Sequence, residues 1–256
     1  PRLEIKEEPP PETPEEPPAP APDHISREEL YTDVLDMASL KKSYFILLAL
    51  STIVAYVGVL RNNPAVIIGS MVIAPLLGPN MGMILGTALG DGKLLQTSAK
   101  TLGFGLVFTF AFAWALGLFL EADPGSREVA SRTYIGLSDM ALALASGSAG
   151  VLSLTMGVAS NLVGVMVALA LLPPLVVSGM LLGSGYPRPA LEAGLLCLAN
   201  IIGLNLSGVL TLLLQGIQPL RWWEKKIARR AIKRAVIGWV ILLAALAAVI
   251  VIKKSL

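Results

Sequence analysis

The sequence has very few of the side chains that hold metal ions or carry out acid–base chemistry. It contains one histidine, His24, and one cysteine, Cys197, among 256 residues. Zinc sites take most of their ligands from cysteine, histidine and carboxylate side chains, so we expect no metal site and no cofactor. A lone cysteine excludes a disulfide within the chain. We also expect no enzymatic activity, because the apolar segments contain neither a metal-binding cluster nor a carboxylate pair.

Charge is also scarce, and this scarcity indicates the class of protein. Charged residues make up 15% of the sequence, hydrophobic residues make up 54%, and the mean hydropathy is +0.70. Residues 44–120 contain only four charged residues, and residues 134–218 contain only three. Soluble domains carry about 25% charged residues. The composition therefore predicts an all-α, polytopic helical membrane protein.

Seven hydrophobic segments have the length expected of membrane-spanning helices. They cover residues 44–60, 64–90, 98–120, 137–157, 160–184, 190–215 and 235–252. The first three form one predicted membrane unit, residues 44–120, and the next three form a second, residues 134–215. Because each unit has an odd number of spans, the second would enter the membrane upside down. This is the inverted 3+3 repeat of many transporters.

Prolines interrupt the second and fifth segments at corresponding positions. Asn161 and Pro174 each lie 99 residues after their counterparts Asn62 and Pro75. A proline removes a backbone donor and clashes with the preceding helical turn, and lipid cannot satisfy the groups that are released. The pattern predicts two broken helices that line a cavity within the membrane. The alternative is that these prolines only kink the helices for packing.

The residues beside the two breaks form the candidate binding site. Free carbonyl groups and half-helix N-termini can hold a small solute or an ion at such places. The candidate residues are Asn62, Asn63, Ser70, Pro75, Pro79 and Asn80 from the first unit, and Ser160, Asn161, Pro173 and Pro174 from the second. These groups are neutral and rich in amides, which suits a polar solute, an anion or a cation and does not select among them.

Other polar and small residues in the apolar segments receive structural interpretations. Asn200 and Asn205 are expected to form hydrogen bonds between helices, because a buried amide needs a partner. Asp139 is expected to cap a helix rather than to relay protons. A group of glycines suits either a homo-oligomer or close packing within one subunit. These glycines are Gly82, Gly86, Gly203 and Gly208.

The N-terminal region has a different character from the apolar segments. Residues 1–25 are rich in proline and glutamate, and we expect them to be a disordered linker. Such a linker predicts an upstream soluble domain, with a ragged terminus as the alternative. Residues 26–43 begin with a capping-box sequence at Ser26 and place Leu30 and Val34 at helical spacing. They predict an amphipathic helix on the membrane surface, unless its apolar face packs on the upstream domain.

A basic segment precedes the last hydrophobic segment. Residues 219–234 predict an interfacial helix, and we expect lipid rather than nucleic acid as its partner because it adjoins a membrane span. The residues assigned to lipid headgroups are Trp222, Trp223, Lys225, Lys226, Arg229 and Arg230. With seven spans, eleven basic residues lie on the N-terminal side of the membrane and six on the other side. This distribution predicts a cytoplasmic N-terminus.

Several parts of the sequence resemble a known family. Residues 27–91 contain an Ile-Ala-Pro-Leu motif at 73–76, and residues 161–185 contain a Leu-Leu-Pro-Pro-Leu motif. Together with residues 139–157, they are similar to domain-of-unknown-function family 389, over about residues 27–215. The resemblance implies a prokaryotic integral membrane protein, in some members attached to an N-terminal soluble domain. It implies no substrate and no functional residues.

Two functions are consistent with these features. The first is an integral membrane transport or channel-like protein for an unidentified small solute or ion, located in the prokaryotic cell (inner) membrane. Its binding site would lie at the two breaks. The second is a non-transporting scaffold or sensor module attached to an N-terminal soluble domain. A hydrated space at the breaks favours the first function, and solid packing around Pro75 and Pro174 favours the second.

Overall fold

In the computed structural model, the chain forms a set of packed α-helices. The structure describes residues 27–134, 136–156, 160–217, 233, 236–242, 244–245 and 248. Regular secondary structure within these residues is entirely helical, which confirms the all-α prediction. The labelled helices are α1 (Arg27–Met37), α2 (Lys42–Leu60), α3 (Pro64–Ile73), α4 (Leu77–Leu89), α5 (Gly92–Gly117), α6 (Arg127–Thr133), α7 (Leu137–Thr155), α8 (Ser160–Gly183) and α9 (Pro187–Leu214), and residues 236–242 are also helical.

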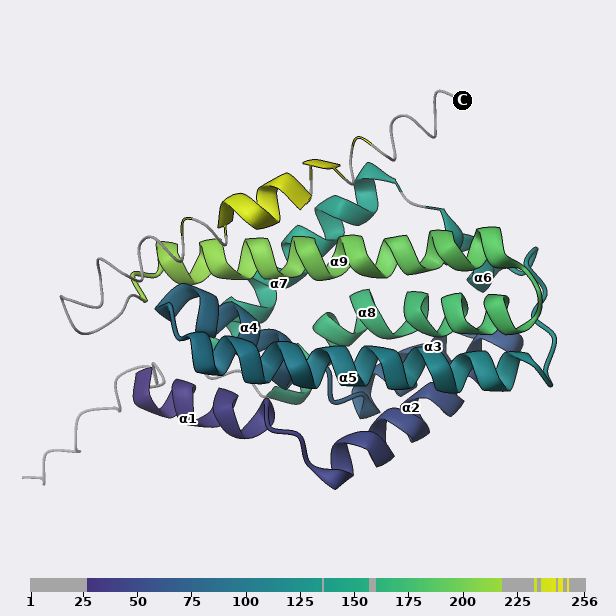
Figure 1. Cartoon of the computed structure of the whole chain (residues 1–256), viewed down its shortest axis with the longest axis horizontal. Helices are drawn as coiled ribbons and strands as arrows, with labels where there is room; N and C mark the ends of the chain where they lie inside the picture. The colour runs from purple at the N-terminus through teal and green to yellow at the C-terminus, as the bar shows by residue number, and fades with distance from the viewer. Residues whose placement is uncertain are drawn as a thin grey trace, which may run out of the picture.

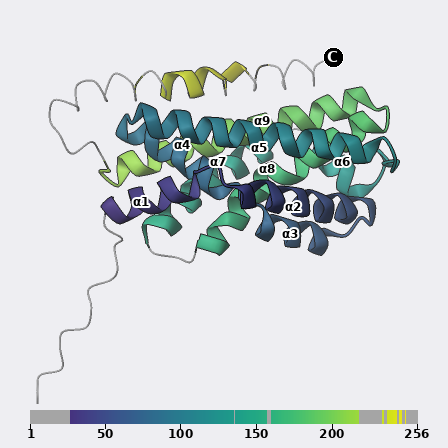
Figure 2. The ribbon, with the colours of Figure 1, turned by 60° about the horizontal axis from the view of Figure 1, so that its bottom comes forward.

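Helices α5 and α9 run the length of the molecule, and the shorter helices pack around them (Figure 1). Helices α1 and α4 lie at one end of the long axis, whereas α2, α3 and α6 lie at the other (Figures 1 and 2). Helix α8 contacts both α5 and α9, and α7 packs mainly on α9. The break between α3 and α4 therefore falls between the two ends of the molecule.

Several helices are suited to a membrane. Helices α2, α5 and α9 are long and apolar enough to cross one, and the bent pairs α3–α4 and α6–α7 raise the number to as many as five if each pair is one crossing. Large apolar side chains lie exposed on the outside, among them Ile46, Val72, Phe104 and Val107. In a soluble protein such a surface would favour aggregation, whereas in a bilayer it meets lipid.

The second predicted segment is broken, as its prolines predict. Helix α3 ends at Ile73, α4 begins at Leu77, and the chain bends by 60° between them. Ala74 has an extended conformation, with ψ at 120°, because a following proline disfavours the helical conformation in the residue before it. Pro79 lies in the first turn of α4, where its missing N–H removes no hydrogen bond of the helix.

The fifth predicted segment is not broken at its proline pair. Helix α8 runs from Ser160 to Gly183 with Pro173 and Pro174 inside it, so the predicted break at this position is wrong. A proline in a helix interior costs about 3 kcal/mol, and close packing offsets this cost, since all of residues 171–180 are buried. A bend of 86° occurs instead between α6 and α7. The inverted repeat stays a prediction.

Close packing between helices depends on glycines. A methyl group added to Gly117 of α5 would lie 2.5 Å from the carbonyl oxygen of Met180 in α8. The glycines considered for self-association also face atoms of their own chain: Gly82 faces Ser98, Gly86 faces Leu95, Gly203 faces Ala143 and Gly208 faces Ile84. These four glycines therefore serve packing within one subunit, and a homo-oligomer stays a prediction that they do not support.

Helix α1 packs on protein with the face that was predicted to meet the membrane surface. Leu30 and Val34 are 4% and 1% exposed, and the helix rests on α4. The hydroxyl group of Tyr31 donates a hydrogen bond of 2.7 Å to Asp91 Oδ2 in the α4–α5 turn. The apolar face predicted within residues 26–43 is thus covered by the same chain rather than by lipid.

Three sequence predictions lie outside the described residues. These are the linker at 1–25, nearly all of the basic helix at 219–234, and much of the last hydrophobic segment at 235–252. The headgroup residues Trp222, Trp223, Lys225, Lys226, Arg229 and Arg230 belong to this group.

We expect Gly117→Ala to destabilise the protein by about 1–3 kcal/mol, because the added methyl group would overpack the contact between α5 and α8. Gly103→Ala in the same helix is the matched control, since no atom lies within 4 Å of its added methyl group. Alanine at this control position should stabilise the helix slightly. Thermal unfolding in detergent, followed by circular dichroism, compares the two variants. Equal unfolding temperatures would contradict the close packing of α5 on α8.

Candidate functional site

The break between α3 and α4 borders a cavity. Its volume is about 360 Å³, which lies within the range of small-molecule binding sites. Three parts of the chain line it: the end of α1 with its connection to α2, the first two turns of α2, and the residues on both sides of the break. Pro75 is the one predicted site residue among them.

The cavity has a polar side and an apolar side. The polar side consists of Asp36, Ser39, Lys41 and Ser43. The apolar side includes Leu47, Val72, Ile73, Pro75 and Leu77. Because Leu47 and Val72 are 38% and 60% exposed, the apolar side continues into the outer surface that we assign to lipid. The cavity therefore lies where polar and apolar surfaces meet.

Lys41 and Asp36 form an ion pair on the polar side. The ammonium nitrogen of Lys41 lies 2.7 and 2.9 Å from the two carboxylate oxygens of Asp36. The side chains are 53% and 72% exposed, and ion pairs in such settings contribute at most about 1 kcal/mol. The hydroxyl group of Ser39 donates to the Asp36 carbonyl group at 2.7 Å. The ammonium group is thus held in place and remains accessible to a ligand.

Glycines fix the α1–α2 connection against α4. A methyl group at Gly78 would overlap the carbonyl group of Met37, and one at Gly82 would press on Ser98 and Ala38. Side chains at these two positions would therefore push α1 away from the first turns of α4. The polar wall of the cavity depends on this contact, since Asp36 lies next to Met37 and Ser39 next to Ala38.

Asp91 ties α1 to the far end of α4. Its Oδ1 accepts hydrogen bonds from the N–H groups of Lys93 and Leu94 at 2.9 and 3.1 Å, and its Oδ2 accepts the Tyr31 hydroxyl. Burial acts to raise the pKa of Asp91, but the hydrogen bonds and the nearby Lys93 charge outweigh burial and lower it. The stabilisation is present above the unfolded pKa and is lost as pH falls through the lower folded pKa. At neutral pH the ionised Asp91 carboxylate therefore keeps its hydrogen bonds to Tyr31, Lys93 and Leu94.

Asn80 lies inside the protein rather than in the cavity. It is 0% exposed, and its Nδ2 donates to the carbonyl group of Leu76 at 2.8 Å. Its Oδ1 lies 3.5 Å from Nδ2 of Asn205 in α9, which donates more closely, at 2.8 Å, to the Ile201 carbonyl group. The Asn205 Oδ1 accepts no hydrogen bond from the described residues. Asn80 thus joins α4 to α9 from a position next to the break.

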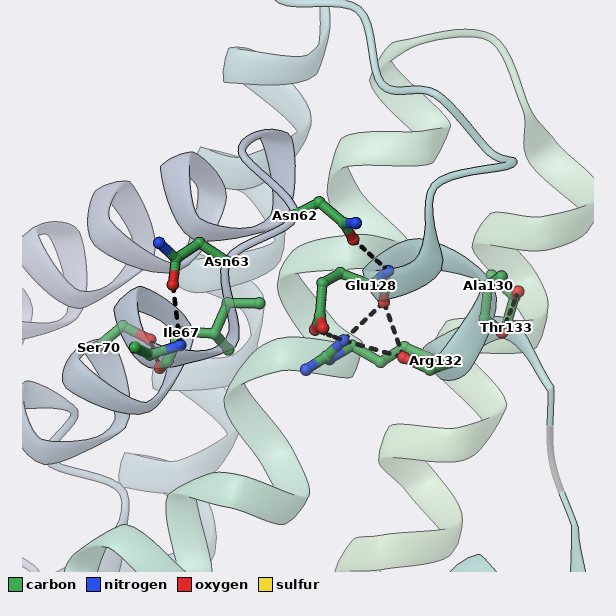
Figure 3. Close-up of polar contacts among 10 residues, drawn as sticks. Asn62, Asn63, Ile67, Ser70, Glu128, Ala130, Arg132 and Thr133 are labelled. Carbon is green, nitrogen blue, oxygen red and sulfur yellow. Dashed lines mark hydrogen bonds and ion pairs between the residues drawn. The ribbon is translucent and has the colours of Figure 1, made fainter.

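Asn62 and Asn63 lie at the opposite end of α3 (Figure 3). Asn62 has a positive φ of 51°, and its Oδ1 accepts a hydrogen bond of 2.9 Å from the Glu128 N–H in α6. Asn63 is the N-cap of α3, and its Oδ1 accepts from the N–H groups of Ala65 and Val66. Ten residues of helix, about 15 Å at 1.5 Å per residue, separate them from the break. Both side chains have structural roles in this arrangement.

Two further polar features are a serine nearer the break and an ion pair in α6 (Figure 3). Ser70 is buried, and its hydroxyl group donates to the carbonyl group of Ile67 in its own helix. Glu128 and Arg132 form an ion pair within α6, with side chains 11% and 17% exposed. This pair was not predicted from the sequence, because one glutamate and one arginine four residues apart are common on helix surfaces.

Of the candidate residues of the second unit, Pro173 and Pro174 do not line the cavity. Pro173 and Pro174 lie in the buried middle of α8. Ser160 and Asn161 form the first turn of the same helix, and their side chains lie outside the described residues. The ten predicted residues are therefore spread over both ends of α3, the first turn of α4 and the length of α8. The structure does not bring them into one cluster.

The polar residues that line the cavity were missed by the sequence analysis. Asp36, Ser39, Lys41 and Ser43 fall within residues 26–43, which the sequence predicts to be an amphipathic surface helix. The available signal was a short polar stretch, residues 39–43, between an amphipathic segment and an apolar one. It shows where α1 stops, but only the docking of α1 on α4 places it beside the break.

Two structural interpretations are confirmed. The Asn200 Nδ2 donates to the Ala170 carbonyl group of α8 at 2.7 Å, which is a hydrogen bond between helices. The Asp139 Oδ2 accepts the N–H of Gly136 at 2.8 Å and so caps α7. Within the residues that the structure describes, no three histidine, cysteine, aspartate or glutamate side chains are grouped so that they could hold a metal ion.

We expect Asn62→Ala to accelerate hydrogen exchange at the Glu128 amide about tenfold, which corresponds to a lost hydrogen bond of about 1–1.5 kcal/mol. Asn62→Asp retains an acceptor at the same place and is the matched control. Asn62→Gly also removes the hydrogen bond but adds no backbone strain, because glycine adopts the positive φ freely. Comparing it with the alanine variant therefore distinguishes the loss of the hydrogen bond from strain in the backbone. Hydrogen–deuterium exchange followed by mass spectrometry reports the rates. An unchanged rate in the alanine variant would show that Asn62 does not hold α6.

Comparison with known proteins agrees with the resemblance read from the sequence. A model of the family described as "Domain of unknown function (DUF389)" matches residues 71–206. An uncharacterised protein of Methanocaldococcus jannaschii is 40% identical over 230 residues, which cover 90% of this chain and 72% of that protein. No solved structure matches the chain. The chain therefore belongs to the family described as Domain of unknown function (DUF389).

Proposed function

We propose that this chain is a multi-pass protein of the prokaryotic cell membrane that carries or conducts a small solute or ion. The long apolar helices and the exposed apolar side chains support a place in the membrane. The distribution of basic residues along the sequence supports a cytoplasmic N-terminus. The cavity at the α3–α4 break is the observation that carries the transport proposal.

A break within an apolar segment provides polar backbone groups for a solute. The last carbonyl groups of α3 and the first N–H groups of α4 lack partners within their own helices. No side chain caps the first turn of α4, whose N-cap residue is Leu76. The negative end of the α3 dipole and the positive end of the α4 dipole meet at this point. A polar solute in the cavity can therefore interact with both.

The two halves of the broken segment pack on different neighbours. Helix α3 rests mainly on α2 and α8, whereas α4 rests mainly on α1, α5 and α9. A change in the angle at residues 74–76 would therefore move α3 relative to α4 locally, while α8, which also packs on α5 and α9, would stay in place. Hinges at a few residues between packed helices are a common basis for opening and closing a site. This mechanism needs one flexible break rather than two.

The packing of α8 favours a second candidate, a non-transporting scaffold or sensor. Pro173 and Pro174 lie within ten consecutive buried residues, 171–180, so this part of the molecule is solid. A scaffold, however, has no need of the cavity beside Pro75. We therefore place transport first and treat the scaffold as the outcome if no solute moves.

Reconstituted liposomes test the proposal. We expect the protein to speed the passage of at least one member of a panel of small ions and polar solutes, and Ser43→Trp to abolish this passage by filling the cavity. Thr97→Trp, on an exposed position of α5 outside the cavity lining, is the matched control and should keep full activity. Flux no faster than in protein-free liposomes for every solute would favour the scaffold. Equal flux in the two tryptophan variants would place the pathway elsewhere.

A further inference from the structure

We propose that the cavity at the α3–α4 break binds a phosphate group through Lys41, and that Asp36 competes with this ligand for the Lys41 ammonium group. The inference rests on the proposed function, because it names the chemical class that the same cavity would take. It stands on the cavity, on the ion pair at its rim and on the hydrogen-bond donors that surround it.

The donors at the cavity come from three sources. Lys41 supplies an ammonium group with three N–H donors. Ser43 supplies an exposed hydroxyl group that makes no hydrogen bond to the residues that the structure describes. The first turn of α2, which begins at Lys42, has no capping side chain, and neither has the first turn of α4. A phosphate group offers three or more oxygen acceptors and suits such a set of donors.

Two negative groups at the cavity repel an anion: the C-terminal end of α3 and the carboxylate of Asp36. Whether an anion binds depends on how strong each repulsion is. The C-terminal end of α3 carries about half a negative charge, which the N-terminal end of α4 offsets by a similar amount. Asp36 carries a full negative charge, but its side chain is 72% exposed. Water can solvate this carboxylate when a ligand displaces it from Lys41, so the displacement costs little. The remaining positive groups are Lys41 and the start of α2.

The position of the cavity leaves two sources of phosphate with the same chemistry. Its polar side, with Lys41 and Ser43, adjoins the first turn of α2, and its apolar side continues along Leu47 and Val72 to the outer surface. A lipid headgroup could place its phosphate at Lys41 and its acyl chains along these apolar side chains. A free phosphate solute would fill only the polar side. The experiment below separates the two.

The test measures inorganic phosphate binding to the full chain in phosphatidylcholine nanodiscs by isothermal titration calorimetry. We expect Lys41→Gln to weaken binding at least tenfold, as for a lost charge-assisted hydrogen bond. We expect Asp36→Asn to strengthen binding about two- to fivefold, because the competitor is removed. Lys100→Gln and Asp33→Asn, at exposed positions outside the cavity lining, are the matched charge controls and should bind as the unmodified protein does.

The opposite signs of the two changes keep the inference open to contradiction even if one variant fails to fold. Weaker binding in Asp36→Asn would show that the carboxylate helps to hold the ligand, as for a zwitterion, and would overturn the inference. Binding unchanged in both variants would also overturn it, as would the absence of phosphate binding in both nanodisc compositions given below.

A second arm identifies the source of the phosphate. Nanodiscs that contain phosphatidylglycerol should reduce the apparent affinity for inorganic phosphate if a lipid headgroup occupies the cavity, and should leave it unchanged if the ligand is a free solute. Either result supports the phosphate site, provided that Lys41→Gln weakens binding. The experiments distinguish an error in the phosphate inference from an error in the transport proposal. Solute flux that Ser43→Trp blocks, without phosphate binding, retains the transport proposal, whereas phosphate binding without any flux retains only the site.

Discussion

The backbone groups released between α3 and α4 are the constraint on which the surrounding structure depends. Pro75 prevents α3 from continuing, and lipid cannot satisfy the carbonyl and N–H groups that the break sets free. The α1–α2 connection brings Ser39, Lys41 and Ser43 to this point. Its position is fixed by contacts that only Gly78 and Gly82 permit. The first part of the chain thus supplies polar groups where the broken segment needs them.

The same residue type has opposite consequences in two places. Pro75 ends a helix beside a cavity, whereas Pro173 and Pro174 lie inside a continuous one. The difference lies in the neighbours, because α8 is enclosed by α5 and α9 and is buried throughout residues 171–180. Dense packing holds its helical backbone despite the lost donors. Proline therefore marks where a break is permitted, and the packing around it decides whether a break occurs.

Local features of the fold could be predicted from the sequence, and features that depend on docking could not. Apolar runs located the helices, and Pro75 located the bend, since these depend on neighbouring residues alone. Asn63 was assigned to the binding site, yet asparagine before proline at a helix start is an N-cap signature that was readable in advance. The ion pair of Asp36 with Lys41 reaches the break only because α1 packs on α4. No local pattern shows that contact.

The central claim is that water reaches the chain at the α3–α4 break, and cysteine accessibility tests it most directly. The one native cysteine, Cys197, is buried and can be replaced by serine. In that background we expect Ile73→Cys, at a partly exposed position that lines the cavity, to react with a membrane-impermeant thiol reagent, because reaction requires a hydrated thiolate. Val177→Cys, at a position 0% exposed in α8, should not react in the folded protein. An unreactive cysteine at position 73, at the same level as the α8 control, would contradict the account.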